Sequence, residues 1–410
     1  MAVDLDFRQN ILPALREIKS FVHLSVNDLN LTGGRVVRDM AGKEIFDNSG
    51  GNAVIFKYEL ADGNVCALRL FKQFPVDEDR IQRLSPISGA LEHIQSPILA
   101  SYRFVNPGLH LQHSDDETEM LGSSFVTPIL LMGWVEGKTL GDYLEACKLH
   151  GDYASLRTVF ARWLELCREM LRLGIAHGDI TARNVMVRSS DGALILVDYD
   201  DLWINNVPHA SGEISGTPGY QHPREKPRRY AQRMDDFSLL VMAVSLAVLA
   251  EDSNEFNSSD QPYFNLTSIT DIESLKFVRA RAVKDAEARV FVKLLERALQ
   301  NGSDSIALDF EKALFAKEIQ QFRAAIKAND RDAAIRMSTQ LGNLRIWQEY
   351  TEEYRNLMGF AAEKALLVLE LAVASENPAW VRQAYESRFI RAAELHQDLQ
   401  RKINVILHNN

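Results

Sequence analysis

Residues 177–201 hold the side chains whose types and spacing could do chemistry. Two short apolar runs in this stretch flank an Asp-Gly pair at 191–192, and such a pair between β-rich segments is a strong signal for a β-hairpin. The hairpin would hold Asp179 and Asn184 just before its first strand and Asp198 just after its second. Two carboxylates and an amide at one edge suit hard Mg²⁺ ions and the phosphates that these ions bridge.

The octet from His177 to Asn184 is a weak signal by itself, because Asp and Asn are ordinary turn residues. The hairpin and its terminal Asp198 make the combination more specific. Together they resemble the catalytic loop and metal-binding segment of protein kinases, which read H-R-D-L-x-x-x-N and D-F-G. The resemblance implies an α+β, bilobal protein-kinase-like fold with a β-rich N-lobe and a helical C-lobe. It also implies ATP and Mg²⁺ as cofactors.

Composition and charge limit the other function classes. A chain of 410 residues can form two or three domains, and its net charge of −10 argues against general binding to nucleic acids or anionic membranes. The N-terminus has neither the basic nor the apolar region of a secretory signal. The longest apolar run, 237–250, is too short for a bilayer and suits a helix buried in protein. We therefore expect a cytoplasmic protein with no membrane or nucleic-acid partner.

The first part of the chain predicts one helix and then strands. Residues 5–22 carry apolar side chains at intervals of three and four, which indicates an amphipathic helix that packs on the following lobe or binds a partner. Strands are expected at 53–60 and 65–71, joined by the turn 61–64.

Features around these strands bear on nucleotide binding. Gly50 and Gly51 permit a tight backbone whose N–H groups can approach a phosphate, although such a pair is more often a plain turn. Against the kinase pattern G-x-G-x-x-G-x-V, Val54 takes the Val position and the three glycines are not kept. Ala67 and Arg69 lie where kinases carry A-x-K, so the arginine would contact the phosphates, or it would form a surface ion pair.

Three further segments continue the resemblance. Residues 77–95 are expected to be helical, but Glu78 stands early and Glu92 late for the glutamate with which kinases pair the phosphate-contacting base. Residues 106–119 predict a solvated loop, since they hold Pro, Gly and an acidic run. Residues 126–140 resemble the kinase hinge, an apolar strand followed by an E-G-x-T-L turn.

The resemblance implies a role for each site residue. Met132 would be the gatekeeper, the backbone of Gly133 and Val135 would bind adenine, and Val54, Ala67 and Met186 would enclose its ring. The nucleotide-contacting set is Gly50, Gly51, Val54, Ala67, Arg69, Met132, Gly133, Val135 and Met186. The catalytic set is Asp179, Asn184 and Asp198, of which Asn184 and Asp198 would hold the metal.

The GTPGYQHP segment at 216–223 resembles the G-T-x-x-Y-x-A-P-E end of a kinase activation loop, but Arg224 replaces its anchoring glutamate. Asp235 opens an apolar run that resembles the helix under the kinase catalytic loop, where it would be a structural carboxylate. Aminoglycoside-type phosphotransferases share the H-G-D loop but lack these two features. The combination resembles a bacterial kinase-like family of the kind found in stress or tellurite-resistance gene clusters.

The last part of the chain shows no strand signal. Segments 325–334 and 372–381 look alike at an offset of 47 residues, which suggests two αα-hairpins of a partner-binding module or a plain helical cap on the kinase lobe. The expected division of the chain is an N-terminal helical extension at 1–34, an N-lobe at 35–135, a C-lobe at 136–312 and an α-helical module at 313–410.

The leading hypothesis is an atypical bacterial serine/threonine protein kinase that transfers the ATP γ-phosphoryl group to a protein substrate. Asp179 would accept the hydroxyl proton, and Arg183 would compensate for Thr181, which stands where kinases carry a lysine. One alternative is a non-catalytic kinase fold, a nucleotide-binding scaffold or sensor whose partner protein binds the C-terminal helices. A second alternative is a small-molecule phosphotransferase.

Overall fold

The computed structural model describes residues 3–4, 11, 31, 33–47, 53–112, 124–207, 213–214, 216–225, 228–267, 272–387, 389–390 and 395–408. The chain divides into two compact units, Met1–Ala307 and Leu308–Asn410, where the sequence placed the boundary at 313. The predicted helix at 5–22 lies outside the described residues apart from Ile11, which is buried.

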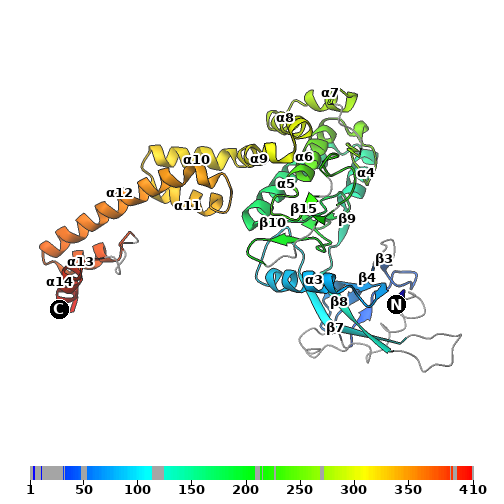
Figure 1. The fold of residues 1–410 in the computed structure, drawn as a ribbon, viewed down its shortest axis with the longest axis horizontal. Coiled ribbons are helices and arrows are strands. Elements are labelled where there is room, and N and C mark those ends of the chain that lie inside the picture. The colour runs from blue at the N-terminus through cyan, green and yellow to red at the C-terminus, as the bar shows by residue number, and fades with distance from the viewer. Residues whose placement is uncertain are drawn as a thin grey trace. The chain divides into compact units, whose positions relative to one another are not determined.

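The first unit is mixed α+β, with antiparallel strands first and helices after them (Figure 1). Its described strands are β1 (Val3–Asp4), β2 (Arg35–Val36), β3 (Phe46–Asp47), β4 (Ala53–Glu59), β5 (Val65–Phe71), β6 (Gln73–Phe74), β7 (Tyr102–Gln112), β8 (Ser124–Gly133), β9 (Gly137–Thr139), β10 (Ile175–Ala176), β11 (Val185–Arg188), β12 (Leu194–Leu196), β13 (Trp203–Ile204), β14 (Glu213–Ile214) and β15 (Arg228–Arg229). Its described helices are α3 (Glu78–Leu91), α4 (Leu140–His150), α5 (Tyr153–Leu173), α6 (Asp236–Glu251), η3 (Ser253–Glu255), α7 (Leu275–Arg281), α8 (Ala286–Asn301) and η4 (Ser303–Ile306).

The largest sheet has the strand order β2-β4-β5-β8-β7, and β3 also pairs with β4. Its register fixes which side chains share a face, because directly opposed residues of neighbouring strands point the same way. Arg69 on β5 lies opposite Ile55 on β4, and Ala67 on the same strand lies opposite Met132 on β8. These four side chains therefore belong to one face of the sheet.

Val54 belongs to the other face. It lies opposite Leu70, and its side chain is fully buried in the core under the sheet. The prediction that Val54 encloses adenine together with Ala67 is therefore wrong, since successive residues of a strand point to opposite faces. Ile55 occupies the position on the shared face.

The solvated loop was predicted at 106–119, and this start is too early in the sequence. β7 continues through residues 106–112 and pairs with β8, with a shift in register between Val105 and Leu109. Pro107 lies at this irregularity, where a strand tolerates the missing N–H of proline. The acidic run at 114–119 lies outside the described residues.

The apolar run near residue 240 forms α6, which is buried from Asp236 to Ala250, as predicted for a helix enclosed by protein. Trp163 on α5 donates its indole N–H to the carbonyl of Leu239 at 3.1 Å, which ties the two helices together. No helix in the described ranges combines the length and the apolar character needed to cross a membrane.

The second unit is helical in its described part. It contains α9 (Ala307–Leu314), α10 (Ala316–Lys327), α11 (Arg331–Leu341), α12 (Trp347–Ala374), α13 (Pro378–Tyr385) and α14 (Gln397–His408). Asn329 and Glu376 both have a φ of 52°, and each precedes a capping residue, Asp330 or Asn377. The two similar segments are therefore the same helix–turn–helix connection, 47 residues apart.

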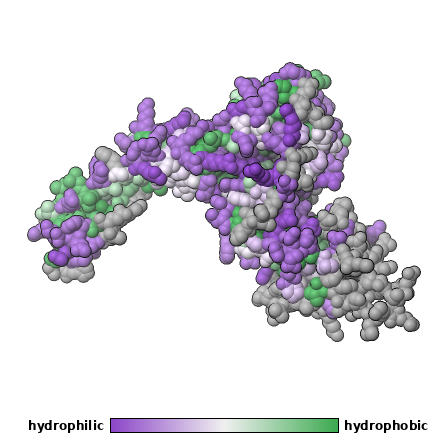
Figure 2. All heavy atoms as spheres, viewed as in Figure 1, coloured by the Kyte–Doolittle hydropathy of each residue, from purple (hydrophilic) through white to green (hydrophobic). Residues whose placement is uncertain are grey.

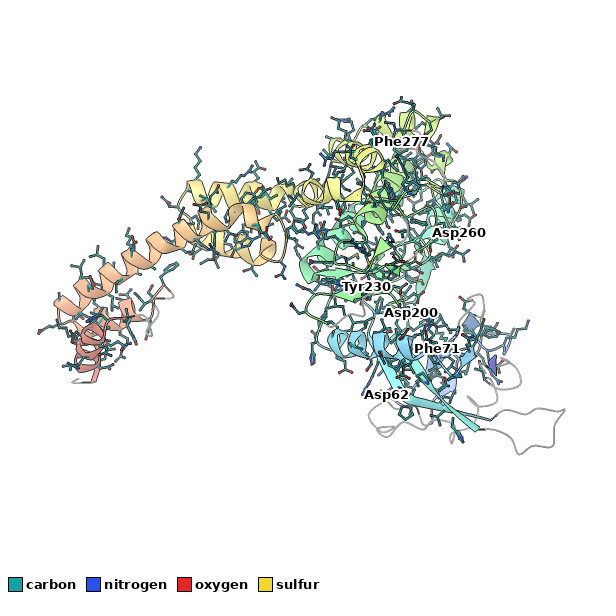
Figure 3. All side chains as sticks on the ribbon, in the orientation of Figure 1. Asp62, Phe71, Asp200, Tyr230, Asp260 and Phe277 are labelled. Carbon is teal, nitrogen blue, oxygen red and sulfur yellow. The ribbon has the colours of Figure 1, made fainter. Side chains whose placement is uncertain are left out.

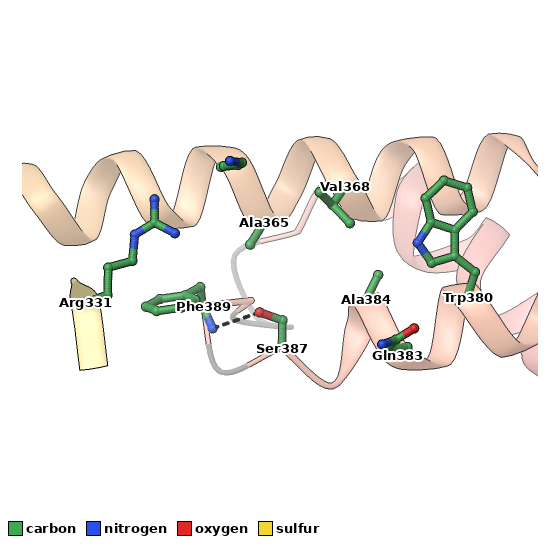
Figure 4. Close-up of a pocket in the computed structure, with 9 residues that line it drawn as sticks. Arg331, Ala365, Val368, Trp380, Gln383, Ala384, Ser387 and Phe389 are labelled. Carbon is green, nitrogen blue, oxygen red and sulfur yellow. Dashed lines mark hydrogen bonds between the residues drawn. The ribbon is translucent and has the colours of Figure 1, made fainter. Parts of the chain in front are cut away.

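A groove of about 370 Å³ lies in this second unit (Figure 4). It is lined by Trp380, Phe389, Val368, Arg331 and Lys364, among others. Figure 2 shows a hydrophobic area over this end of the unit. Leu367 and Leu371 of α12 are among the exposed large apolar side chains of the unit. Apolar surface of this kind is typical of a binding surface, and a partner for it stays a prediction.

Candidate functional site

The predicted β-hairpin is present. β11 and β12 are antiparallel, with Val185 opposite Leu196, and the N–H of Val197 donates to the carbonyl of Asn184 at 3.0 Å. This last bond joins the residue before the first strand to the residue before Asp198. Asn184 and Asp198 therefore lie at the same end of the hairpin.

Asp179 is held between Asn184 and Thr217. Nδ2 of Asn184 donates to the carbonyl oxygen of Asp179 at 2.8 Å and to its Oδ2 at 3.1 Å. From the other side, Thr217 donates its N–H to Oδ1 at 2.6 Å and its hydroxyl to Oδ2 at 3.0 Å. The half-buried carboxylate is thus fixed in orientation.

The loop that carries Asp179 is fastened by Asp235. The buried carboxylate of Asp235 accepts the backbone N–H groups of His177 and Gly178, and the guanidinium of Arg228 lies 3.9 Å away. Burial raises the pKa of Asp235, while the charges of His177 and Arg228 and the two N–H groups oppose that shift. Asp235 therefore has the contacts of the structural carboxylate that the sequence predicted.

Gly178 is required at its position by the backbone. Its φ is +87°, and a Cβ would lie 2.6 Å from the carbonyl oxygen of Asp201 and 2.7 Å from Cδ1 of Ile214. A side chain such as the arginine of H-R-D would therefore displace the segment that follows Asp198. The H-G-D form of the motif is a packing requirement of this chain.

Asp198 has an unusual backbone conformation for a non-glycine residue. Its φ is +66°, and its side chain is half exposed. A non-glycine residue in this left-handed conformation raises the free energy of the folded chain. Such a conformation persists mainly where the surrounding structure and the function impose it. The turn after β12 is therefore built to present this carboxylate.

Arg69 reaches the hairpin from the sheet. Its Nη1 lies 2.7 Å from Oδ1 of Asp198, and its two terminal nitrogens bind the two oxygens of Asp200 at 2.6 and 2.9 Å. Figure 3 shows Asp200 at this junction between sheet and helices of the first unit. The Arg69 side chain is only 14% exposed, so the alternative of a surface ion pair is wrong.

The charges of this cluster depend on each other. Burial raises the pKa of Asp200, the charge of Arg69 opposes that shift, and Asp198 adds to it. Burial also disfavours the cation of Arg69, but the attraction of Asp200 and Asp198 outweighs it and raises the pKa of Arg69. The two carboxylates therefore stabilise the cation of Arg69 in this buried position.

Helix α3 does not supply the carboxylate partner of Arg69. Glu78 is exposed in its first turn, and Glu92, just after its end, lies 3.9 Å from Arg103. The helix instead contributes Arg83, whose Nη1 donates to Asp201 at 2.8 Å. The expected glutamate pair is replaced by a pair with the segment after the hairpin.

Aromatic rings connect the same segment to the sheet. Tyr199, in the position of the phenylalanine of D-F-G, is fully buried and packs against the rings of His177 and Tyr102 at 6.1 and 5.3 Å. Its hydroxyl donates to the carbonyl of Leu196 and accepts the N–H of Ala100. The loop and the sheet are thus held together by packing as well as by charge.

Four of the other predicted nucleotide contacts lie in the described part of the chain. Met132 is buried near the end of β8, Gly133 is the half-buried last residue of that strand, and Val135 is half-buried in the link to β9. Met186 lies half-buried on β11. Gly50 and Gly51 lie outside the described residues, so their place by a phosphate stays a prediction.

Arg183 does not take the role proposed for it. Its exposed side chain forms an ion pair with Asp260. The buried hydroxyl of Thr181 accepts the N–H groups of Arg183 and Asn184 at 3.3 and 3.2 Å. Thr181 therefore shapes the loop, and the idea that Arg183 replaces a phosphate-binding lysine is wrong for this conformation.

The polar atoms at the hairpin end fit Mg²⁺ bound together with phosphates. In the part of the chain that the structure describes, no group of three or more His, Cys, Asp or Glu side chains is arranged to hold a metal by itself. Nucleotide-bound Mg²⁺ needs fewer protein ligands, since phosphates and waters complete its shell. Oδ1 of Asn184 and Oδ2 of Asp198 accept no hydrogen bond from a described residue and remain available.

The GTPGYQHP segment and the two residues after it are anchored on the end of α8 and on η4, where Glu225 accepts the N–H of Ser303 at 2.8 Å. His222 lies with Nε2 3.2 Å from the carbonyl of Ala298, and Arg224 donates to the carbonyl of Leu299 at 2.8 Å. The Tyr220 hydroxyl accepts an N–H from the loop before β11 at 3.1 Å. The end of α8 and the start of η4 thus hold the segment, with His222, Arg224 and Glu225 as the contacting residues.

Sequence reasoning missed Asp200, Thr217 and Arg83. The sequence did contain a signal for the role of Asp200. The Asp-Tyr-Asp-Asp run at 198–201 has more carboxylates than a metal site needs, and no counter-charge had been assigned to Arg69. No protein-family model matches this chain, and no curated protein is similar to it in sequence.

Proposed function

We propose that the chain is a serine/threonine protein kinase of bilobal kinase-like fold, which transfers the γ-phosphoryl group of ATP to a protein hydroxyl. The observation that carries the proposal is the joint placement of Asp179, Asn184 and Asp198 on a loop fastened by Asp235. An ordinary surface turn has no need of a buried carboxylate that accepts two of its backbone N–H groups. The motif resemblance of residues 216–223 supports the same reading.

Each residue has contacts that suit its proposed role. Asp179 would accept the proton of the substrate hydroxyl, because Thr217 and Asn184 already orient its carboxylate. Asn184 and Asp198 would hold Mg²⁺, whose charge offsets that of the phosphates. Arg69 would contact the phosphates from the sheet.

One observation favours a nucleotide-binding scaffold without catalysis. Arg69 already donates to Oδ1 of Asp198 at 2.7 Å, so this cation competes with Mg²⁺ for the carboxylate. Catalysis is still the better proposal, because a scaffold would not need an oriented base at Asp179 in addition.

Purified protein incubated with Mg²⁺ and γ-labelled ATP should label a protein serine or threonine, and Asp198→Asn should remove that label. The variant loses a metal ligand, so its Mg²⁺-dependent affinity for ATP should fall by at least about tenfold. Asp304→Asn, at an exposed acid of η4, is the matched control. ATP binding without any transfer by the wild type would support the scaffold, and label found only on an aminoglycoside-like acceptor would support a small-molecule phosphotransferase.

Asp200→Asn should weaken ATP binding. Without the bidentate partner, Arg69 has Asp198 as its remaining carboxylate and should hold it away from Mg²⁺. We expect the nucleotide Kd to rise by about tenfold and the free energy of unfolding to fall by about 1–3 kcal/mol. Nucleotide titration and urea unfolding measure the two effects.

Asp201→Asn is the control for that variant. Its ion pair with Arg83 is about one third exposed, so its loss should cost less than about 1 kcal/mol. Equal effects of the two substitutions on the nucleotide Kd would show that Asp200 has no special part in placing Arg69.

A further inference from the structure

A cavity of about 450 Å³ lies at the other end of the hairpin, away from Asp198. Its walls are faces of α4 and α5 and the ribbon of β9 and β11 with the turn that follows. The side chains that decide its chemistry are Lys138, Tyr143, Arg162, Arg188, Ser189 and Asp191. The volume lies in the range of ligand pockets.

The side chains that line the cavity carry a net positive charge, although the chain as a whole is negatively charged. Lys138, Arg162 and Arg188 face one acid, Asp191, whereas the whole chain has a net charge of −10. Arg188 and Asp191 bind each other through two hydrogen bonds at 2.9 and 2.7 Å and so cancel. Arg162 also attracts Asp191 electrostatically, so three cations share one carboxylate and a net positive charge remains.

The side chains of Lys138 and Arg162 also have hydrogen-bond donors to offer a ligand. Neither side chain has a hydrogen bond or ion pair with any residue within the described ranges. Arg162 is half-buried on α5, and its place is set by Gly192, where a Cβ would lie 1.9 Å from Nη1. The φ of +67° at Gly192 belongs to the same hairpin turn, which brings the backbone against the guanidinium.

We propose that this cavity binds a phosphate group. Two unpaired cations with hydroxyl groups beside them form the donor set that a tetrahedral dianion needs, and Arg and Lys are the usual phosphate ligands. The source is a phosphorylated Ser or Thr side chain of a peptide or the free phosphate ion, which share this chemistry. The proposal does not depend on phosphoryl transfer at Asp179, because none of the catalytic residues lines the cavity.

The test uses the full chain and three probes: inorganic phosphate, the blocked tripeptide Ala-phosphothreonine-Ala, and the same tripeptide without phosphate. Calorimetric titration should show binding of a phosphate-bearing probe and none of the unphosphorylated peptide. Lys138→Gln and Arg162→Gln should each weaken this binding by at least about tenfold. Tighter binding of the phosphopeptide assigns a modified side chain as the ligand, and equal binding of inorganic phosphate assigns the free ion.

Arg157→Gln is the matched control, since Arg157 is exposed on the same helix α5 and does not line the cavity. Gly192→Ala is a second variant that keeps both cations but displaces Arg162, and it should weaken binding as well. The proposal is overturned if neither phosphate-bearing probe binds, or if both Gln variants bind as tightly as Arg157→Gln. Thermal unfolding of each variant checks that it is folded.

Discussion

Asp179→Asn should lower the rate of phosphoryl transfer by about 10²–10⁴-fold, the range that a positioned general base contributes. The substitution keeps the size of the side chain and removes the proton acceptor. Asn184 keeps its hydrogen bond to the backbone carbonyl of residue 179, and Asp198 is unchanged, so the affinity for ATP with Mg²⁺ should stay within about twofold of the wild type. Initial rates of label transfer and nucleotide titration measure the two quantities separately.

Thr217→Val tests how much the orientation of the Asp179 carboxylate contributes, because it leaves the charge of that carboxylate unchanged. The variant removes one of the two hydrogen bonds from Thr217 to Asp179 but leaves the backbone N–H. We expect a smaller loss of rate, about tenfold, with unchanged ATP affinity. An Asp179→Asn protein that transfers phosphate at the wild-type rate would exclude Asp179 as the base.

Asp235→Asn should cost about 3–5 kcal/mol of unfolding free energy, the usual result when one partner of a buried charged pair is removed. The amide has one acceptor oxygen, so its nitrogen would face an N–H of His177 or Gly178. Arg228, whose side chain is 8% exposed, would lose its counter-charge. Urea unfolding of the first unit, followed by tryptophan fluorescence, measures the effect.

Asp304→Asn is the control for this experiment as well. Replacement of an exposed acid away from such contacts should change the free energy of unfolding by less than about 0.5 kcal/mol. Asp235→Asn should also reduce phosphoryl transfer, since it loosens the loop that carries Asp179. A variant that is as stable as Asp304→Asn would contradict the anchoring role.

The hairpin could be predicted because its signals are local. An Asp-Gly turn between two apolar runs specifies both strands and their pairing, and the residues that flank them follow. The likeness of segments 325–334 and 372–381 was visible in the sequence too, and in the structure each segment holds a helix–turn–helix connection. These predictions rest on the local sequence.

The errors concern contacts between distant segments. Val54 and Ile55 are both β-branched, and only the pairing of β4 with β5 decides which of them shares a face with Arg69. The partner of Arg69 is 131 residues away in the chain, and no spacing rule connects the two. Pro107 indicated a loop, but an irregularity in the pairing of β7 accommodates it.

The ion pair of Arg69 with Asp200 has a consequence for control of the proposed kinase. Kinases that take the carboxylate from the helix next to the sheet can be switched off when that helix swings outward and withdraws it. Here neither partner belongs to α3, so an outward movement of this helix would not by itself remove the counterion of Arg69. A signal that acts through α3 would instead reach Asp201 through its hydrogen bond with Arg83. It would then tilt the turn after β12, while Arg69 keeps its counterion.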